Sequence, residues 1–248
     1  MSNNFSYLAF LTFLAASVTP LASAETVVLH GATTVLNVVV GPHRAAVEKA
    51  TGHTLTVVGN ATGKGLADLV DGKADASMSS EPVEIAVAAA LVAGKTVDPK
   101  TLQFHVIKND EIVFVVHPSN PVSKLTWAQL SDIHTGKISN WKEVGGKDAP
   151  IVVFADALTG GTRAMIKKVV MDGKEYGSSV KAMISVVRVA ESVAKEENSI
   201  GGVGKGFADP VKTKILQSNK IERPLGFITI GAPSAKVKQV IDAFKRAG

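Results

Sequence analysis

Short turns rich in hydroxyl side chains and glycine recur along the chain, each between an apolar run and a stretch that favours a helix. They are Thr33-Thr34, Thr62, Ser79-Ser80 and Thr159-Gly160-Gly161-Thr162. The first N–H groups of a helix lack partners and carry the positive end of its dipole. Several such turns meeting at one place would bind a small oxyanion, because the hydroxyls add donors and glycine allows close approach. Taken singly, each turn is more commonly an ordinary helix N-cap.

The elements around these turns follow a repeating order of strand, turn and helix. We expect strands at 26–30, 54–58, 74–78 and 151–154, and helices at 33–52, 65–70, 83–93 and 160–172. This alternation is typical of a parallel sheet with crossover helices. In open α/β sheets, ligands bind beyond the carboxyl ends of the strands. The turns that follow these strands should therefore meet at one edge.

Two extended apolar runs, 112–116 and 226–230, divide the chain. The last helix, from Ser234, carries apolar residues at i, i+3, i+4 and i+7 and needs a surface to pack on. We predict an α/β, two-lobed fold in which each lobe is a sheet flanked by helices and two hinge strands join them. Lobe one would comprise 25–116 and 226–248, and lobe two would comprise 117–225. Within lobe two we expect helices at 126–135, 178–187 and 189–197, the first opened by a capping box.

Residues 1–24 have the pattern of a cleavable signal peptide. An apolar run, 8–16, precedes Ala22-Ser23-Ala24, which suits signal peptidase, although the segment has no Lys or Arg and a retained anchor is the alternative. We expect export to the periplasm. The chain has no cysteine, which excludes disulfides, thiolate metal sites and a lipid-bearing N-terminal cysteine.

Composition argues against several classes of function. The net charge of +5 is modest, and no Lys/Arg cluster with interleaved aromatics indicates nucleic-acid binding. The six histidines are scattered, so we expect no metal and no cofactor. A hydrolase with a Ser or Thr nucleophile is an alternative, but no histidine lies in these turns to act as its base. We therefore expect a monomeric binding protein and not an enzyme.

One passage resembles the periplasmic phosphate-binding proteins of ABC importers. It comprises 125–133, 136–141 and 144–146, and shorter matches lie at 31–35, 72–82, 118–122, 161–163 and 223–225. The resemblance implies a PBP-like type II fold, capture of inorganic phosphate between the lobes, and delivery to the membrane subunits of an ABC transporter.

The resemblance also assigns residues to the ligand. The expected ligand-binding residues are Thr33, Thr34, Thr62, Ser79, Ser80, Gly161, Thr162 and Asp156. Asp156 stands where these proteins carry an arginine, and Ser80 stands where they carry an aspartate. Another oxyanion, an organic acid, a cationic group held by Asp156, or a cleft without a ligand are therefore alternatives. For a dianion to bind, Asp156 should pair with a cation such as Arg163 or point away from the cleft.

Overall fold

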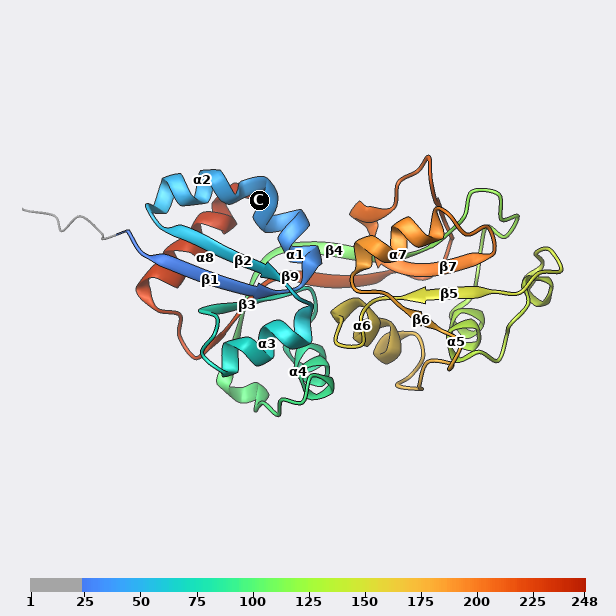
Figure 1. Cartoon of the computed structure of the whole chain (residues 1–248), viewed down its shortest axis with the longest axis horizontal. Coiled ribbons are helices and arrows are strands. Elements are labelled where there is room, and N and C mark those ends of the chain that lie inside the picture. The colour runs from blue at the N-terminus through green and yellow to red at the C-terminus, as the bar shows by residue number, and fades with distance from the viewer. Residues whose placement is uncertain (1–23) are drawn as a thin grey trace, which may run out of the picture.

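The structure, a computed structural model, describes residues 24–248. The expected signal peptide lies almost entirely outside the described residues. Two bodies of helices and strands lie side by side along the long axis (Figure 1). We use lobe one for the body around β1–β3 and lobe two for the body around β5–β7. No helix in residues 24–248 combines the length and the apolar character needed to cross a membrane.

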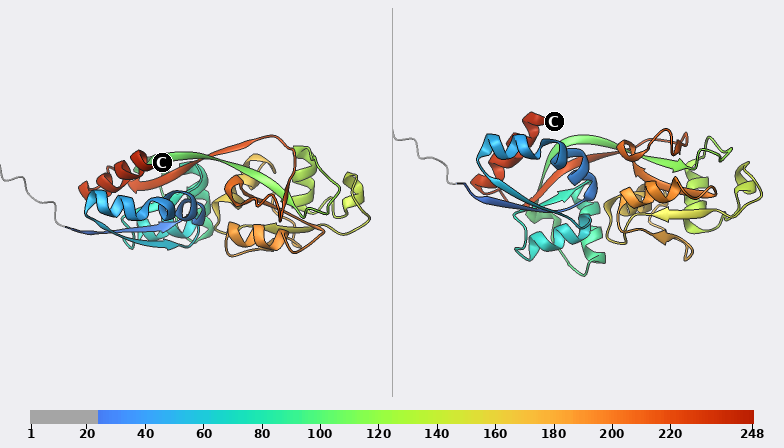
Figure 2. Two further views of the ribbon diagram at one scale, coloured as in Figure 1. Left: turned by 90° about the horizontal axis from the view of Figure 1, so that it is seen from above. Right: turned by 45° about the horizontal axis from the view of Figure 1, so that its top comes forward.

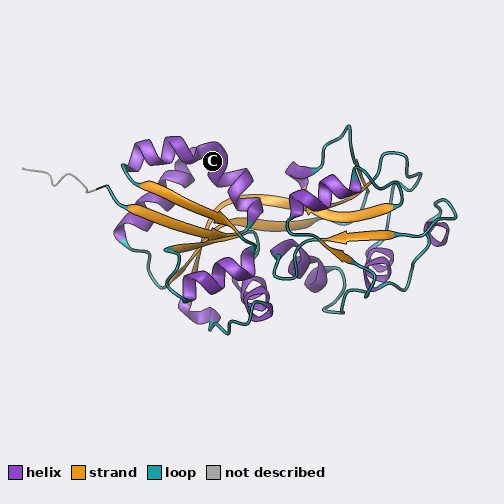
Figure 3. Ribbon diagram, viewed as in Figure 1, coloured by secondary structure: helices purple, strands orange, loops and turns teal. Residues whose placement is uncertain are grey.

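Lobe one contains parallel strands, the helices that connect them and the C-terminal helix. Its elements are β1 (Thr26–Gly31), α1 (Thr33–Val35), a π-helical segment (Leu36–Val40), α2 (Gly41–Thr51), β2 (Thr54–Gly59), α3 (Thr62–Val70), β3 (Ala76–Ser79), α4 (Val83–Val92), a 3-10 turn (Pro99–Thr101) and α8 (Ala235–Ala247). Lobe two contains α5 (Trp127–Thr135), a 3-10 turn (Trp141–Val144), β5 (Val152–Ala155), α6 (Gly161–Val169), β6 (Lys181–Ala182), α7 (Val186–Val193), β7 (Ser199–Gly204), a 3-10 turn (Lys205–Phe207) and β8 (Lys214–Ile215). Helices flank the strands in both bodies, as the predicted α/β class requires (Figure 3).

Two long antiparallel strands, β4 (Leu102–Val116) and β9 (Ile221–Ile230), run between the lobes (Figure 2). They belong to one nine-stranded sheet of order β2-β1-β3-β9-β4-β7-β5-β6, in which β8 also pairs with β4. Residues 226–228 of β9 pair with β3, and residues 112–116 of β4 pair with β7. The two hinge strands of the expected fold are thus parts of a continuous sheet. The boundaries 25–116 with 226–248, and 117–225, stay a prediction.

The apolar stripe of the C-terminal helix packs into lobe one. Val237, Val240, Ile241 and Phe244 are buried in one core with residues of β1, β2 and α2. Figure 1 shows α8 beside α2, although about 180 residues separate them in the chain. Burial of such a stripe removes apolar surface from water and fixes the helix to this lobe.

Local signals in the sequence account for several helix ends. Thr126 and Gln129 form the expected capping box of α5. The helical stretch that begins with α1 and continues through α2 ends at Gly52, which has the left-handed conformation with φ 71°. Its irregular part is the π-helical segment just before Gly41, and Gly41-Pro42 themselves begin α2.

The helix expected at 178–187 is wrong. Lys181–Ala182 forms β6, which pairs in parallel with β5. Helix α7 begins only at Val186, where the Ser185 hydroxyl accepts from the Arg188 N–H. The serine is a helix cap in this position, so the segment before it stays extended.

Candidate functional site

The carboxylate of Glu81 is the centre of a buried polar cluster between the lobes. Glu81 follows β3 and is fully buried. The Thr62 hydroxyl, at the start of α3, donates to Glu81 Oε2 at 2.8 Å, and the Ser80 hydroxyl donates to Oε1. Both donors lie in turns that the sequence singled out. These two hydroxyls therefore meet at one anionic group.

Arg223 on β9 supplies the positive charge of the cluster. Its Nη1 donates to Thr162 Oγ1 at 2.8 Å and reaches Glu81 Oε1 at 3.4 Å. Its Nε and Nη2 donate to Asp110 Oδ2 at 3.0 and 2.8 Å. Asp110 is the cross-strand partner of Arg223 in the pairing of β4 with β9. The guanidinium is 1% exposed, so its charge is matched by protein carboxylates and not by water.

The N-terminus of α6 closes the cluster from lobe two. Gly160 is the N-cap and Gly161 is the first helical residue. A Cβ at Gly161 would overlap the Glu81 carboxylate, which shows how closely the two lie. The first turn of a helix presents unpaired N–H groups and a positive dipole end. The start of α6 therefore favours an anion where the Glu81 carboxylate lies.

Burial raises the pKa of Glu81, while Arg223 and the hydroxyls of Ser80 and Thr62 oppose that rise. The same groups that bind the carboxylate also stabilise its charged form. The hydrogen bonds and Arg223 therefore offset only part of the cost of burying this carboxylate.

Asp156 follows β5 and lines the same space with 7% of its surface exposed. Its Oδ1 accepts from the Ala157 N–H at 2.9 Å, and no Lys, Arg or His of the described residues forms an ion pair with it. Burial raises the pKa of Asp156 to about 6, and the nearby Glu81 charge adds to the rise.

The expectation that Asp156 is paired or averted is wrong in this structure. Arg163, the expected partner, lies over the Tyr176 ring at 4.0 Å. Arg163 lies at the third position after the α6 N-cap Gly160 and points toward that ring, so its charge acts on Asp156 only from a distance.

A cavity of about 10 Å³ lies at the centre of the site, room for about one water molecule. The expected residues that line it are Thr33, Thr34, Thr62, Ser80, Asp156 and Gly161. Thr162 lies in the surrounding network, where its hydroxyl accepts from Arg223. Ser79 does not join them, because its hydroxyl donates to the Glu81 backbone carbonyl at 2.8 Å and only stabilises the turn.

Three residues of this network were not among the expected site residues. The sequence pattern assigns no role to Glu81 or Asp110, and Arg223 falls only within the matching segment 223–225. Arg223 lies just before the extended apolar run 226–230, and a charged residue beside such a run is the usable signal. In residues 24–248 no group of three His, Asp or Glu side chains is arranged to hold a metal ion.

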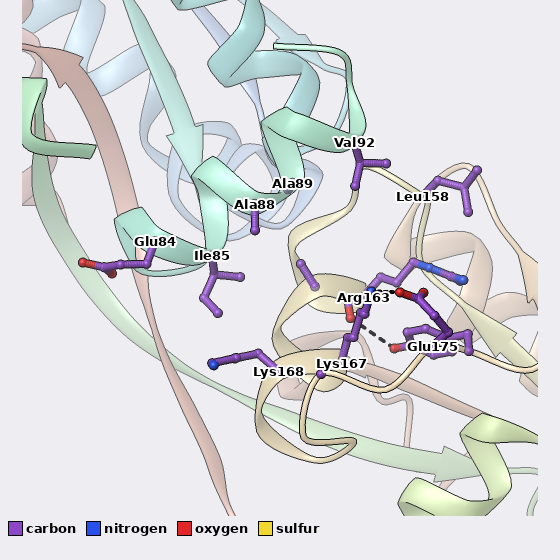
Figure 4. A pocket seen from close by; sticks show the side chains of 13 residues that line it. Glu84, Ile85, Ala88, Ala89, Val92, Leu158, Arg163, Lys167, Lys168 and Glu175 are labelled. Atoms are coloured by element: carbon purple, nitrogen blue, oxygen red, sulfur yellow. Dashed lines mark hydrogen bonds and ion pairs between the residues drawn. The ribbon is translucent and has the colours of Figure 1, made fainter. Parts of the chain in front are cut away.

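A second, larger pocket of about 510 Å³ lies between α4 and α6 (Figure 4). One wall is apolar and comes from α4, with Ile85, Ala88, Ala89 and Val92. The opposite wall comes from α6 and the loops beside it, where Lys167 pairs with Glu175 and the Tyr176 hydroxyl donates to the Arg163 carbonyl at 3.1 Å. Figure 4 shows no ring of side chains converging on one point here.

The sequence model of the family described as PBP superfamily domain matches residues 16–244. The chain belongs to the PBP superfamily. Among its curated relatives is the phosphate-binding protein PstS of Bacillus subtilis, 29% identical over 51% of this chain and 42% of the relative. PstS of Staphylococcus epidermidis is 28% identical over 68% of this chain and 50% of the relative. The chain thus spans about half the length of these relatives. Their names are those of binding proteins, in agreement with the expectation that this chain is not an enzyme.

Solved structures share the fold of this chain over nearly its whole length. A putative phosphate ABC transporter substrate-binding protein from Clostridium perfringens, with bound phosphate, has a TM-score of 0.74 and 24% identity over 88% of this chain and 92% of its own. The effector-binding domain of QuiR in complex with shikimate has a TM-score of 0.64 and 16% identity over 91% of this chain and 98% of its own. Members of one fold therefore bind different ligands, and the ligand here has to be argued from the site.

Proposed function

We propose that this protein is an extracytoplasmic solute-binding protein that holds a small oxyanion between its lobes and delivers it to the membrane subunits of an ABC importer. The observation that carries the proposal is the meeting of donors on the Glu81 carboxylate, itself an oxyanion. Two hydroxyls, one guanidinium and the start of α6 converge there from both lobes. Such a convergence binds two anionic oxygens by hydrogen bonds as well as by charge.

Inorganic phosphate is the first ligand to test. The names of the relatives support this choice, as do the threonines at strand ends. In this proposal the predicted signal peptide directs the chain to the periplasm, and the monomer closes its lobes over the solute. The absence of histidine from the turns also supports binding over hydrolysis.

The test is a titration of the protein with phosphate, sulfate and acetate, followed by calorimetry and thermal unfolding. Binding should raise the unfolding temperature, since a ligand at 100 times its Kd adds about 2.7 kcal/mol. Thr62→Val keeps the shape of the side chain and removes one donor, so oxyanion affinity should fall about 10-fold or more. Thr26→Val is the matched control, because Thr26 is exposed at the far end of β1.

If neither the wild type nor a Glu81→Ala protein binds any of these anions, the proposal is contradicted. Equal affinity of the Thr62 and Thr26 variants would contradict the assigned site. The first result tests whether an oxyanion binds at all, and the second tests where it binds.

A second candidate is a ligand with a hydrogen-bond donor or a positive charge. It is favoured by Asp156, a buried carboxylate that faces the cavity with no ion pair. Glu81 and Asp110 contact the one guanidinium and Asp156 adds a third carboxylate nearby, and this excess of negative charge disfavours a dianion. An ammonium salt and small amines in the same titration would reveal such a ligand.

A further inference from the structure

The Glu81 carboxylate contacts both lobes. Its backbone belongs to the turn between β3 and α4 of lobe one. Its carboxylate lies against Gly161 at the start of α6, in lobe two, and reaches Arg223 on the strand that runs between the lobes. A single side chain thus contacts lobe one, lobe two and a hinge strand.

The surroundings of this carboxylate have the composition of a binding site for a free anion. Each oxygen accepts from a hydroxyl, Oε2 from Thr62 and Oε1 from Ser80, and Oε1 also faces Arg223. The fully buried carboxylate takes up the space toward which these donors point, and the adjoining cavity measures only about 10 Å³. A tetrahedral oxyanion needs more room than this. It can make the same contacts only if the carboxylate leaves.

Other contacts between the lobes lie around this cluster, and the largest of them is apolar. The Gly63 N–H of α3 donates to the Thr159 carbonyl at 3.0 Å. Helices α4 and α6 contact each other, and Ile85 of α4 packs against the core of lobe two, although the same helices also line the 510 Å³ pocket. The hydrogen bonds and charge of the cluster are therefore the main polar connection across the cleft.

We propose that Glu81 is a built-in ligand of the cleft, a side-chain carboxylate that occupies the anion position and holds the lobes closed without a solute. One consequence of this inference rests on the proposed function: an external oxyanion competes with Glu81 for the same donors. Solute binding then exchanges one anion for another on the same donors. Affinity is reduced by the cost of displacing a ligand tethered at high effective concentration.

Lobe opening can be measured directly, because the chain contains no cysteine. Cysteines at the exposed positions Lys49 in lobe one and Lys137 in lobe two would carry a donor and an acceptor fluorophore. In this labelled protein, Glu81→Ala should lower the transfer efficiency without any added anion, since the lobes open. The exposed Glu84→Ala, three residues further along, is the matched control and should leave the efficiency unchanged.

Formate and acetate provide a second measurement, since they replace the missing carboxylate. Either anion at millimolar concentration should close the Glu81→Ala protein again and should leave the wild type unchanged. Phosphate should bind Glu81→Ala at least 10-fold more tightly than it binds the wild type. Glu81→Gln keeps the volume of the side chain and should give an intermediate opening, so it serves if the alanine variant does not fold.

The outcomes separate the two proposals. Variants of Glu81 that stay as closed as the wild type, or a wild type that binds phosphate as tightly as Glu81→Ala, would overturn the built-in ligand and leave oxyanion binding intact. In another outcome, the Glu81→Ala protein opens, formate closes it again, and phosphate and sulfate have no effect. This result would support the built-in ligand and overturn the proposed transport of phosphate and sulfate.

Discussion

Two spaces between the lobes differ in almost every property. The site around Glu81 has a cavity of about 10 Å³ and a dense set of hydroxyls and charges. The space between α4 and α6 has about 510 Å³ and a wall of Ile85, Ala88, Ala89 and Val92. Volume alone would select the second as the ligand site.

The donors select the first space. Polar groups that converge on one point decide what a site recognises, while an apolar wall only excludes water. The small cavity follows from closed lobes and from a side chain that already uses the donors. The large space exists because small alanine side chains on α4 leave a gap opposite α6. Changes in the first space should therefore affect both stability and binding, and changes in the second should affect neither.

Removal of the central cation should have the largest effect. Arg223→Met keeps much of the side-chain volume and leaves Glu81 and Asp110 buried without their partner. Breaking a buried pair in this way costs about 3–5 kcal/mol. Urea unfolding at pH 7.5 should show this loss. The control is Arg188→Met, which breaks only an exposed pair with Glu191 and should cost less than about 1 kcal/mol.

A loss of similar size in the two arginine variants would remove the distinction between the buried cluster and the surface. It would mean that Glu81 and Asp110 rehydrate freely when Arg223 is replaced, and that the lobes open at little cost.

Asp156→Asn should have the next largest effect on stability, and the size of that effect depends on pH. The pKa of Asp156 is raised by burial from its ordinary 3.8 to about 6. A raised pKa gives a stability contribution that is complete below about pH 3.8 and is lost as the pH rises through about 6. The difference between these two pKa values corresponds to about 3 kcal/mol of the free energy of unfolding at pH 7.5. Asp156→Asn should therefore stabilise the fold at pH 7.5 and have little effect at pH 4.

The same variant discriminates between the two ligand classes. Removal of the charge should strengthen phosphate binding by about 1 kcal/mol, because one close repulsion is lost. An amine or another cationic ligand should bind less well. The exposed Asp148→Asn is the control for both measurements. A stability that does not depend on pH between 4 and 7.5 in the wild type would show that Asp156 is solvated and not part of the buried site.

The arrangement of the site could be predicted in part, because it follows from topology. Parallel strands bring their carboxyl ends to one edge, so Thr34, Thr62 and Ser80 had to meet once β1, β2 and β3 were recognised. The strand-turn-helix order also predicts the α/β class. The final helix could be assigned to lobe one because its stripe required an apolar partner.

The charged part of the site could not be predicted in the same way. Asp110 and Arg223 meet only because β4 and β9 pair in a particular register, across a bulge between Val106 and Lys108. That Glu81 enters the site together with Ser80 depends on the local path of the turn after β3. Arg163 could have faced Asp156 or Tyr176, and spacing along the chain does not decide between them.

The smallest effect is expected in the large space between α4 and α6. Ala88 is exposed and lines this space from α4, and Gln is a good helix former that adds a polar group without a charge. Ala88→Gln should leave phosphate affinity within about twofold of the wild type, since none of the donors around Glu81 changes. Its effect on stability should stay within about 0.5 kcal/mol, the range of surface substitutions away from special features. Calorimetry with phosphate on the variant and on Thr62→Val, side by side, makes the comparison direct. If Ala88→Gln weakened binding as much as Thr62→Val, the solute would have to occupy the space between α4 and α6. The convergence of donors on Glu81 would then be a structural ion pair and not the binding site of the protein.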